Sequence, residues 1–421
     1  MVRTRIEKIV TRVTARISIL VFFIMAFEIM IMISPFAFFF YSVFNPIFHF
    51  LDSFVATRWL TAFFLPHMIL PPTLFLKAVR VLGSVCFVAG SFAFVVCALH
   101  VYLGKVFKWG IASRGLYRLI RHPQYTALGV WGIGMSILWP RFIVLASLSV
   151  MFILYYLLAK DEEKRMLRLY GASYQDYMDR TGMFVPKQVE RRISFVPEGP
   201  WRYAVVPMSI LVLVIGTGFF LREVTLGSLA FESRGNLTLV PILPEDETMS
   251  AGVLAGLLTQ NGGVDAGLSG DKDYLGYVMP VDYIMQGMIA DTGTEFHLYK
   301  KHHTVAMINE WVLHPFQHLR SSPSLHMAQM FHVDPAVARR HHCPIAAKKA
   351  DGDCDSCTYR RVALVEIEHA GGHISGSALL GVDTTRVPVS FIDINAKTGQ
   401  IVNIVRVRKA TAWEDVPTPG M

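Results

Sequence analysis

Two charged stretches, each beside an apolar run, decide how this chain is interpreted: GLYRLIRHPQY (residues 115–125) and EEKRMLRLYGASYQDY (residues 162–177). Between them lie the apolar runs 125–138 and 142–158, joined by the turn Trp139-Pro140-Arg141. A helix needs about 20 apolar residues to cross a bilayer. These runs therefore predict a short, tightly packed membrane hairpin that brings both charged stretches to the same face.

The remainder of the sequence also has the composition of a membrane protein. Hydrophobic residues make up 53% and charged residues 17%, whereas soluble domains average about 25% charged residues. The sequence predicts a polytopic α-helical membrane protein of about five spans, near residues 17–44, 81–103, 125–138, 142–158 and 204–221.

The distribution of charge predicts the orientation. Residues 1–222 contain 24 Lys and Arg against 10 Asp and Glu, and residues 223–421 contain the remaining 16 and 22. The basic groups precede the first, third and fifth spans, and such groups mark cytoplasmic ends, so they do not indicate nucleic-acid binding. We expect a transmembrane domain, residues 1–222, with a cytoplasmic N terminus. An extracytoplasmic domain, residues 223–421, follows, and it is periplasmic if the chain lies in a bacterial inner membrane.

The charged residues of the hairpin predict a polar pocket. Arg121 and His122 stand where a connector enters the bilayer, and Glu162 and Glu163 stand where the returning helix leaves it. Charges at this depth are costly unless they are paired or used. Such a pocket suits a zwitterionic cofactor, with cations for a carboxylate, acids for an amino group or ribose hydroxyls, and apolar walls for a base. The alternative is juxtamembrane anchoring, in which Arg and His extend to lipid headgroups.

The segments RHPQY, EE and YGxxYxxY at this spacing resemble the superfamily of isoprenylcysteine carboxyl methyltransferases and phospholipid methyltransferases, over about residues 80–187. Sterol reductases have a similar core but generally more spans. The resemblance implies S-adenosylmethionine (SAM) as cofactor. The residues that it implies for cofactor binding are Tyr117, His122, Tyr125, Glu162 and Glu163.

The resemblance also implies that Arg121 shapes the site or binds the substrate. An amine nucleophile would need a base, and Glu163 or Glu162 are the candidates for that catalytic role. The sequence departs from many members at Ala127, where they have Gly two residues after the motif tyrosine. The expected activity is methylation of a lipidic or small amphipathic acceptor, through a carboxylate, thiol or amine, at the cytoplasmic membrane interface.

Residues 223–421 predict an α+β domain. Three segments have the alternation of strands: 360–369, 387–395 and 401–409. The last two flank AKTGQ, a Gly-containing loop, and therefore predict a hairpin.

Eleven of the fifteen histidines lie between His297 and His373. His342, Cys343, Cys354 and Cys357 form a candidate tetrahedral site for zinc, iron or copper. His314 and His318, four residues apart on one helix face, suit a metal or haem. A disulfide between two of the cysteines and ordinary surface histidines are the alternatives. The rival function is a membrane-anchored metal- or haem-binding or complex-assembly protein, with a partner bound by this domain and the methyltransferase-like core as scaffold.

Overall fold

The computed structural model describes residues 12–20, 22–23, 48, 50–67, 69–107, 113–193, 202–259, 268–281, 290–291, 359–407 and 409–410. The chain divides into two compact units. The first comprises Met1–Ile29 with Leu82–Phe219, and the second comprises Met30–Val81 with Phe220–Met421. A functional division at residue 222 stays a prediction.

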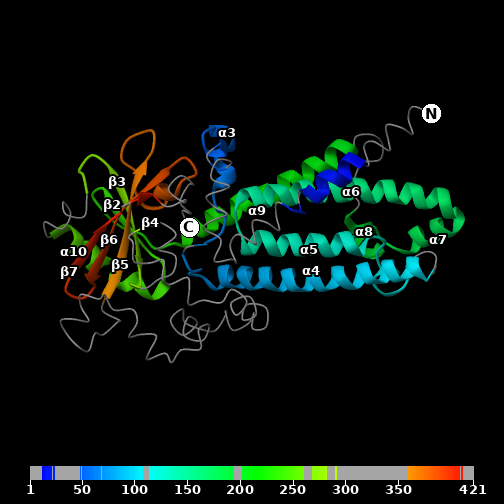
Figure 1. The fold of residues 1–421 in the computed structure, drawn as a ribbon, viewed down its shortest axis with the longest axis horizontal. Coiled ribbons are helices and arrows are strands. Elements are labelled where there is room, and N and C mark those ends of the chain that lie inside the picture. Colours follow the sequence, from blue (N-terminus) through cyan, green and yellow to red (C-terminus); the bar gives the residue numbers. More distant parts are fainter. Residues whose placement is uncertain are drawn as a thin grey trace, which may run out of the picture. The chain divides into compact units, whose positions relative to one another are not determined.

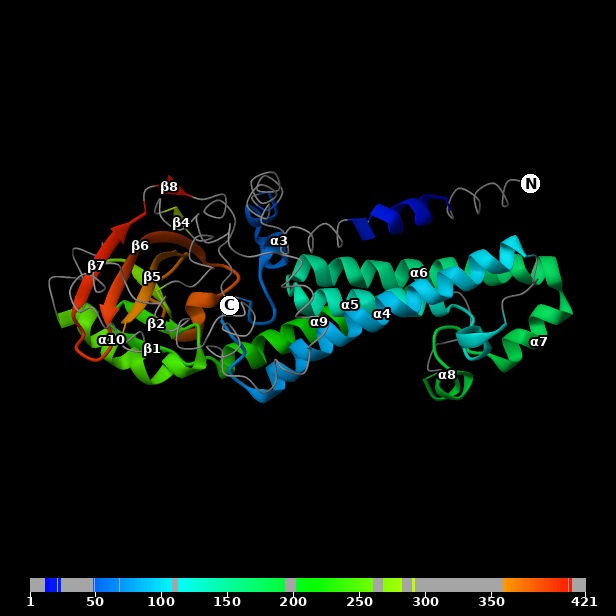
Figure 2. The same cartoon turned by 60° about the horizontal axis from the view of Figure 1, so that its bottom comes forward.

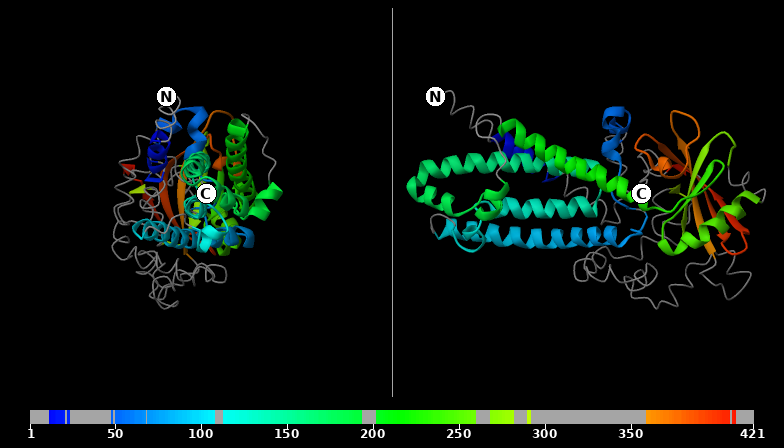
Figure 3. Two further views of the ribbon diagram at one scale, coloured as in Figure 1. Left: turned by 90° about the vertical axis from the view of Figure 1, so that its right-hand side faces the viewer. Right: turned by 180° about the vertical axis from the view of Figure 1, so that it is seen from behind.

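The first unit contains α5 (Pro123–Leu138), α6 (Phe142–Tyr170) and most of two longer helices, α4 (Leu74–Val106) and α9 (Arg202–Ser228). Figures 1 and 3 show them side by side. Pro123 is the first residue of α5, where a helix requires no backbone donor, and the predicted turn at residues 139–141 separates α5 from α6. Two short helices, α7 (Ala172–Arg180) and α8 (Lys187–Ile193), follow α6.

Helix α6 extends twelve residues beyond the apolar run that predicted it. Residues 159–170 are mostly Lys, Glu, Arg, Met and Leu, which are good helix formers in water. The helix ends at Gly171, whose φ of +54° is a conformation that favours glycine. Gly171 therefore ends this helix, and its polar last part carries the two acids.

Three helices of the described residues are long and apolar enough to cross a membrane: Leu74–Gly104, Phe142–Tyr170 and Ala204–Ser228. They fit a polytopic helical membrane protein. The count of five spans stays a prediction, because most of residues 17–44 lie outside the described residues and α5 has only 16 residues.

Helices α4 and α5 pack backbone against backbone. A Cβ atom at Gly90 of α4 would lie 2.5 Å from the Trp131 nitrogen and 2.8 Å from the Ala127 oxygen of α5. Gly134 of α5 makes a similar approach to Phe87 of α4. Small residues permit such contacts between membrane helices, and the contact fixes α5, which carries one half of the site.

The second unit contains a six-stranded sheet in the order β1-β2-β3-β5-β6-β7 (Figure 2). Its strands are β1 (Glu232–Arg234), β2 (Leu237–Pro241), β3 (Asp273–Met279), β5 (Tyr359–Glu368), β6 (Thr385–Asn395) and β7 (Ile401–Arg406). Only β2 and β3 pair in parallel among these strands. Parallel neighbours need a crossover, and helix α10 (Glu247–Thr259) lies in it.

The core of the second unit lies between α10 and the sheet. Val253 and Leu257 of α10 pack with Leu237 and Leu239 of β2 and with residues from β3, β5 and β6. Shorter elements complete the described parts of the chain: α3 (Val55–Arg58), η1 (Trp59–Thr61), η2 (Gly115–Arg118), η3 (Pro244–Asp246), η6 (Gly376–Leu380), β4 (Ala290–Asp291) and β8 (Lys409–Ala410).

The C-terminal sheet confirms the expected strands. Segments 360–369 and 387–395 correspond closely to β5 and β6, segment 401–409 contains all of β7, and β6 pairs antiparallel with β7 around the predicted loop. Pro388 lies in β6, next to an irregularity in its pairing with β5, which is where a strand accepts proline. The side of the membrane on which this unit lies stays a prediction.

Candidate functional site

An ionic cluster of four residues, Arg121, His122, Glu162 and Glu163, forms where α5 begins and α6 approaches its end. Arg121 Nε lies 2.6 Å from Glu163 Oε1, and both side chains are 4% exposed. His122 Nδ1 lies 3.6 Å from Glu162 Oε2, and His122 Nε2 lies 3.6 Å from Glu163 Oε1. The structure therefore brings together the two pairs that the hairpin argument placed on one face.

Backbone pairing attaches this cluster to the segment that follows α7. The Arg121 N–H donates to Gly182 O over 2.8 Å, and the His122 N–H donates to Met183 O over 3.1 Å. The guanidinium of Arg121 also donates to Met178 O over 3.1 Å and to Thr181 O. Arg121 thus satisfies carbonyls at the end of α7 as well as a carboxylate, a common use of a cation at a helix C terminus.

The two acids have different environments. Glu163 is buried, and its carboxylate faces Arg121, His122 and, at 3.6 Å, Lys160 Nζ. The side chain of Glu162 is 47% exposed, and Tyr125 Oη donates to it over 3.4 Å. Glu163 therefore holds the protein's own cations, while Glu162 retains a surface that a ligand can contact.

The second and third tyrosines of the YGxxYxxY segment lie on α7 and link it to η2. Tyr174 and Tyr177 are both buried, and Tyr177 Oη donates to Tyr117 O over 2.6 Å. Burial raises the pKa of Tyr177 to about 12, despite the opposing effect of Arg121. The ring of Tyr117 stacks on His100. Tyr117, expected to contact the cofactor, is engaged here by Tyr177 and His100.

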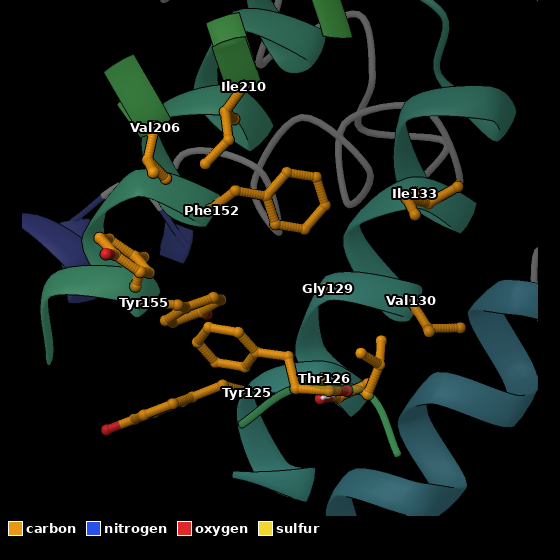
Figure 4. A pocket seen from close by; sticks show the side chains of 12 residues that line it. Tyr125, Thr126, Gly129, Val130, Ile133, Phe152, Tyr155, Val206 and Ile210 are labelled. Carbon is orange, nitrogen blue, oxygen red and sulfur yellow. Dashed lines mark hydrogen bonds between the residues drawn. The ribbon is translucent and has the colours of Figure 1, made fainter. Parts of the chain in front are cut away.

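Tyr125, which donates to Glu162 of the ionic cluster, also lines an apolar pocket of about 410 Å³ (Figure 4). Helices α5, α6 and α9 and residues 184–185 form its walls: Tyr125, Thr126, Gly129, Val130, Ile133, Phe152, Tyr155, Tyr156, Phe184, Val185, Val206 and Ile210. In Figure 4, Val206 and Ile210 lie on the side away from Tyr125. Ala127 does not line this pocket; it is buried, and its carbonyl faces Gly90 of α4. The methyl group at this departure from the family pattern therefore does not narrow the pocket.

An aromatic stack, His122, Tyr125 and Tyr155, leads from the ionic cluster into the apolar pocket. The His122 and Tyr125 ring centroids lie 5.6 Å apart, and those of Tyr125 and Tyr155 lie 5.0 Å apart with the rings 9° from parallel. The end members each carry a buried polar atom, His122 Nε2 and Tyr155 Oη, that has no hydrogen-bond partner among the described residues.

Sequence reasoning did not identify Tyr155, because a tyrosine in the apolar run FILYYLLA is ordinarily a core residue. Its spacing from Glu162 in the sequence could have indicated that it lies near the site. The two residues are seven apart in one helix, which places them on the same face two turns apart.

The proposed metal ligands cannot be placed. His314, His318, His342, Cys343, Cys354 and Cys357 all lie outside the described residues. Among the residues that are described, no group of three or more His, Cys, Asp or Glu side chains could hold a metal ion. The expectation of a metal or haem site therefore has no support from the structure.

Two of the clustered histidines do have described positions, and both contact Asp273 at the start of β3. His369 Nε2 and His373 Nδ1 lie 3.0 Å and 2.7 Å from its carboxylate, and the Ile374 N–H donates to it over 2.9 Å. Burial raises the pKa of Asp273, but these hydrogen bonds outweigh it and hold that pKa below its usual range.

Comparison with known proteins gives one match. Residues 80–173, under a quarter of the chain, match the family model described as phospholipid methyltransferase. The match includes all of the ionic cluster and confirms the resemblance in this segment. No curated protein and no solved structure matches the chain.

Proposed function

We propose that this integral membrane protein is a SAM-dependent methyltransferase that acts on a lipidic or small amphipathic acceptor. The observation that carries the proposal is the junction of two unlike surfaces: a buried ionic cluster and an apolar pocket, joined by the aromatic stack. Both lie largely within or beside the segment that matches a methyltransferase family.

The chain's own residues fit the polar part of SAM. His122 Nε2 is buried and makes no hydrogen bond within the described residues, with Glu163 Oε1 3.6 Å away, and Glu162 is half exposed next to the ring. We assign these two residues to cofactor binding, together with the ring of Tyr125. Arg121 and Glu163 satisfy each other, and we assign them to holding His122 and the segment 178–183 in place.

When bound, SAM supplies an electrophilic methyl group on a sulfonium. The protein's contribution is alignment and the exclusion of water, which provide most of the rate in a reaction of this kind. A carboxylate or thiolate acceptor has no proton to lose. An amine acceptor passes its proton to a base, and Glu162 is the better candidate because cations already surround the carboxylate of Glu163.

The apolar pocket supports an acceptor with a hydrocarbon part. Its walls come from α5, α6 and α9 and consist mostly of apolar and aromatic side chains, and α6 and α9 have the length and composition of membrane spans. A lipid could therefore reach the pocket from the bilayer, with its reactive group directed toward the ionic cluster.

We further propose that the site lies at the cytoplasmic interface and that residues 223–421 lie on the opposite side, in a bacterium the periplasm of the inner membrane. The support is the distribution of Lys and Arg along residues 1–222. A topology reporter fused at residue 421 should be active only outside the cytoplasm. A reporter that is active in the cytoplasm would contradict the orientation.

A SAM titration of the purified full-length protein tests the proposed function. We expect saturable binding that weakens at least about tenfold in His122→Ala and in Glu162→Gln, since each loses a polar contact worth about 1.4 kcal/mol or more. Asp161→Asn is the matched control, because Asp161 precedes Glu162 in the same helix and pairs with Arg165. Folded protein that binds no SAM, or His122→Ala that binds like the wild type, would sink the proposal.

A further inference from the structure

Tyr155 lines the apolar pocket, and its hydroxyl is a buried polar atom without a hydrogen-bond partner among the described residues. The residue is 4% exposed, and no hydrogen bond to Tyr155 Oη forms within the described parts of the chain. Buried hydroxyls in folded proteins nearly always have a partner. A ligand bound in the pocket would supply the hydrogen-bond partner that the Tyr155 hydroxyl lacks.

The neighbouring hydroxyls of the pocket are already engaged. Thr126 Oγ1 donates to Phe184 O over 2.9 Å, and Tyr125 Oη donates to Glu162. The remaining walls near Tyr155 include Phe152, a side chain with no hydrogen-bonding group. A water molecule there would find few of the two to four polar partners that a buried water needs.

The position of Tyr155 separates it from the polar cofactor residues. Seven residues of helix place Glu162 about 10 Å along the axis from Tyr155, and the ring of Tyr125 lies between the ionic cluster and Tyr155. A zwitterion such as SAM has its charged partners in the ionic cluster. The walls around Tyr155 are mostly apolar and aromatic, so they favour a partner that is largely apolar and carries one polar group.

We propose that Tyr155 is the polar contact for the acceptor: its hydroxyl hydrogen-bonds to a single oxygen or nitrogen carried by an otherwise apolar molecule. This assignment rests on the proposed function for the word acceptor, but the contact itself requires no SAM. It selects amphiphiles over plain hydrocarbons, because a hydrocarbon in the pocket leaves the hydroxyl unpaired.

The test compares two probes of equal chain length, 1-dodecanol and dodecane. Each displaces a fluorescent fatty acid from the full-length protein in phosphatidylcholine nanodiscs without SAM, in the wild type, Tyr155→Phe and Tyr170→Phe. Partition of each probe into the bilayer is the same for all three proteins, so it cancels when they are compared. Tyr170→Phe removes an exposed hydroxyl from the same helix and serves as the control.

We expect the preference for dodecanol over dodecane to fall about tenfold in Tyr155→Phe and to stay unchanged in Tyr170→Phe. The thermal unfolding temperature of Tyr155→Phe should be no lower than that of the wild type, because the variant loses a hydroxyl that the protein itself leaves unpaired. A purely structural tyrosine would lower it.

Three results would overturn the proposal: a wild-type preference for dodecanol in Tyr155→Phe, a wild type that binds neither probe, or a Tyr155→Phe protein that is destabilised and loses both probes. The SAM titration reports on the proposed function separately. Tyr155→Phe should bind SAM like the wild type, so failure of one idea leaves a result distinct from failure of the other.

Discussion

Glu163→Gln removes one charge from the buried ion pair that supports the ionic cluster. The amide keeps an oxygen for Arg121 Nε but no longer balances the guanidinium, and Lys160 Nζ, 3.6 Å away, also loses its counter-charge. Both members of the pair are 4% exposed, so water compensates little. The substitution leaves the packing volume almost unchanged, which isolates the charge.

The expected cost follows from this geometry. Removing one partner of a buried pair costs about 3–5 kcal/mol. Arg121 keeps its bonds to Met178 O and Thr181 O, so we expect the lower end, about 3 kcal/mol. Asp161→Asn is the control: its partner Arg165 is 3.1 Å away, but both side chains are partly exposed, and such pairs contribute about 0.3–0.5 kcal/mol.

The assay is reversible denaturant unfolding of the purified protein in detergent micelles, with SAM affinity measured on the same samples. Glu163→Gln should lose stability and bind SAM more weakly, because residues 178–183 and His122 are held through Arg121. Asp161→Asn should change neither quantity measurably. If Glu163→Gln costs no more than Asp161→Asn, the pair does not support the site and the reasoning is refuted.

Two further predictions concern packing and pH. Gly90→Ala should destabilise the protein by about 1–3 kcal/mol, since its Cβ would lie 2.5 Å from the backbone nitrogen of Trp131, whereas Gly216→Ala, with open space around it, should stabilise it by about 0.5–1 kcal/mol; equal unfolding free energies for the two variants would contradict this. The pKa of Asp273 is held low by its donors, including the Ile374 N–H, so its stabilising effect is complete above the unfolded pKa of about 3.9 and is lost as the pH falls through the lower folded pKa. The unfolding free energy of Asp273→Asn should therefore be lower than that of the wild type near pH 6, and the two values should converge at acid pH. A difference that does not change with pH would count against this.

The helical hairpin and its charged ends could be predicted because local chemistry determines them. Pro140 stops a helix wherever the rest of the chain lies, and an apolar run flanked by charge indicates the membrane depth of its ends. The positions of Arg121, His122, Glu162 and Glu163 near one another follow from these two facts alone. The same holds for the β6–β7 hairpin, whose alternation and Gly-containing loop are adjacent in sequence.

The different environments of the two acids in the ionic cluster could not be predicted. Glu162 and Glu163 have the same chemistry in the sequence, and only the rotation of α6 buries Glu163 against Arg121 and His122 while Glu162 stays half exposed. Arg121 also donates to the backbone carbonyls of residues 178 and 181. Every residue type has such a carbonyl, so the sequence does not reveal these contacts. Tyr155 differs from a core tyrosine only in lacking a partner, and that is a property of the assembled pocket.

The pairing of residues 119–122 with 182–183 joins the site to a segment that lies after the α5–α6 hairpin in the sequence. Arg121 and Glu163 are both synthesised when the α5–α6 hairpin is complete, but the carbonyls that hold the Arg121 guanidinium and the backbone partners of Arg121 and His122 belong to residues 178–183. A chain truncated after α6 therefore contains every charge of the ionic cluster but lacks the carbonyls of residues 178–183 that accept hydrogen bonds from Arg121 and His122.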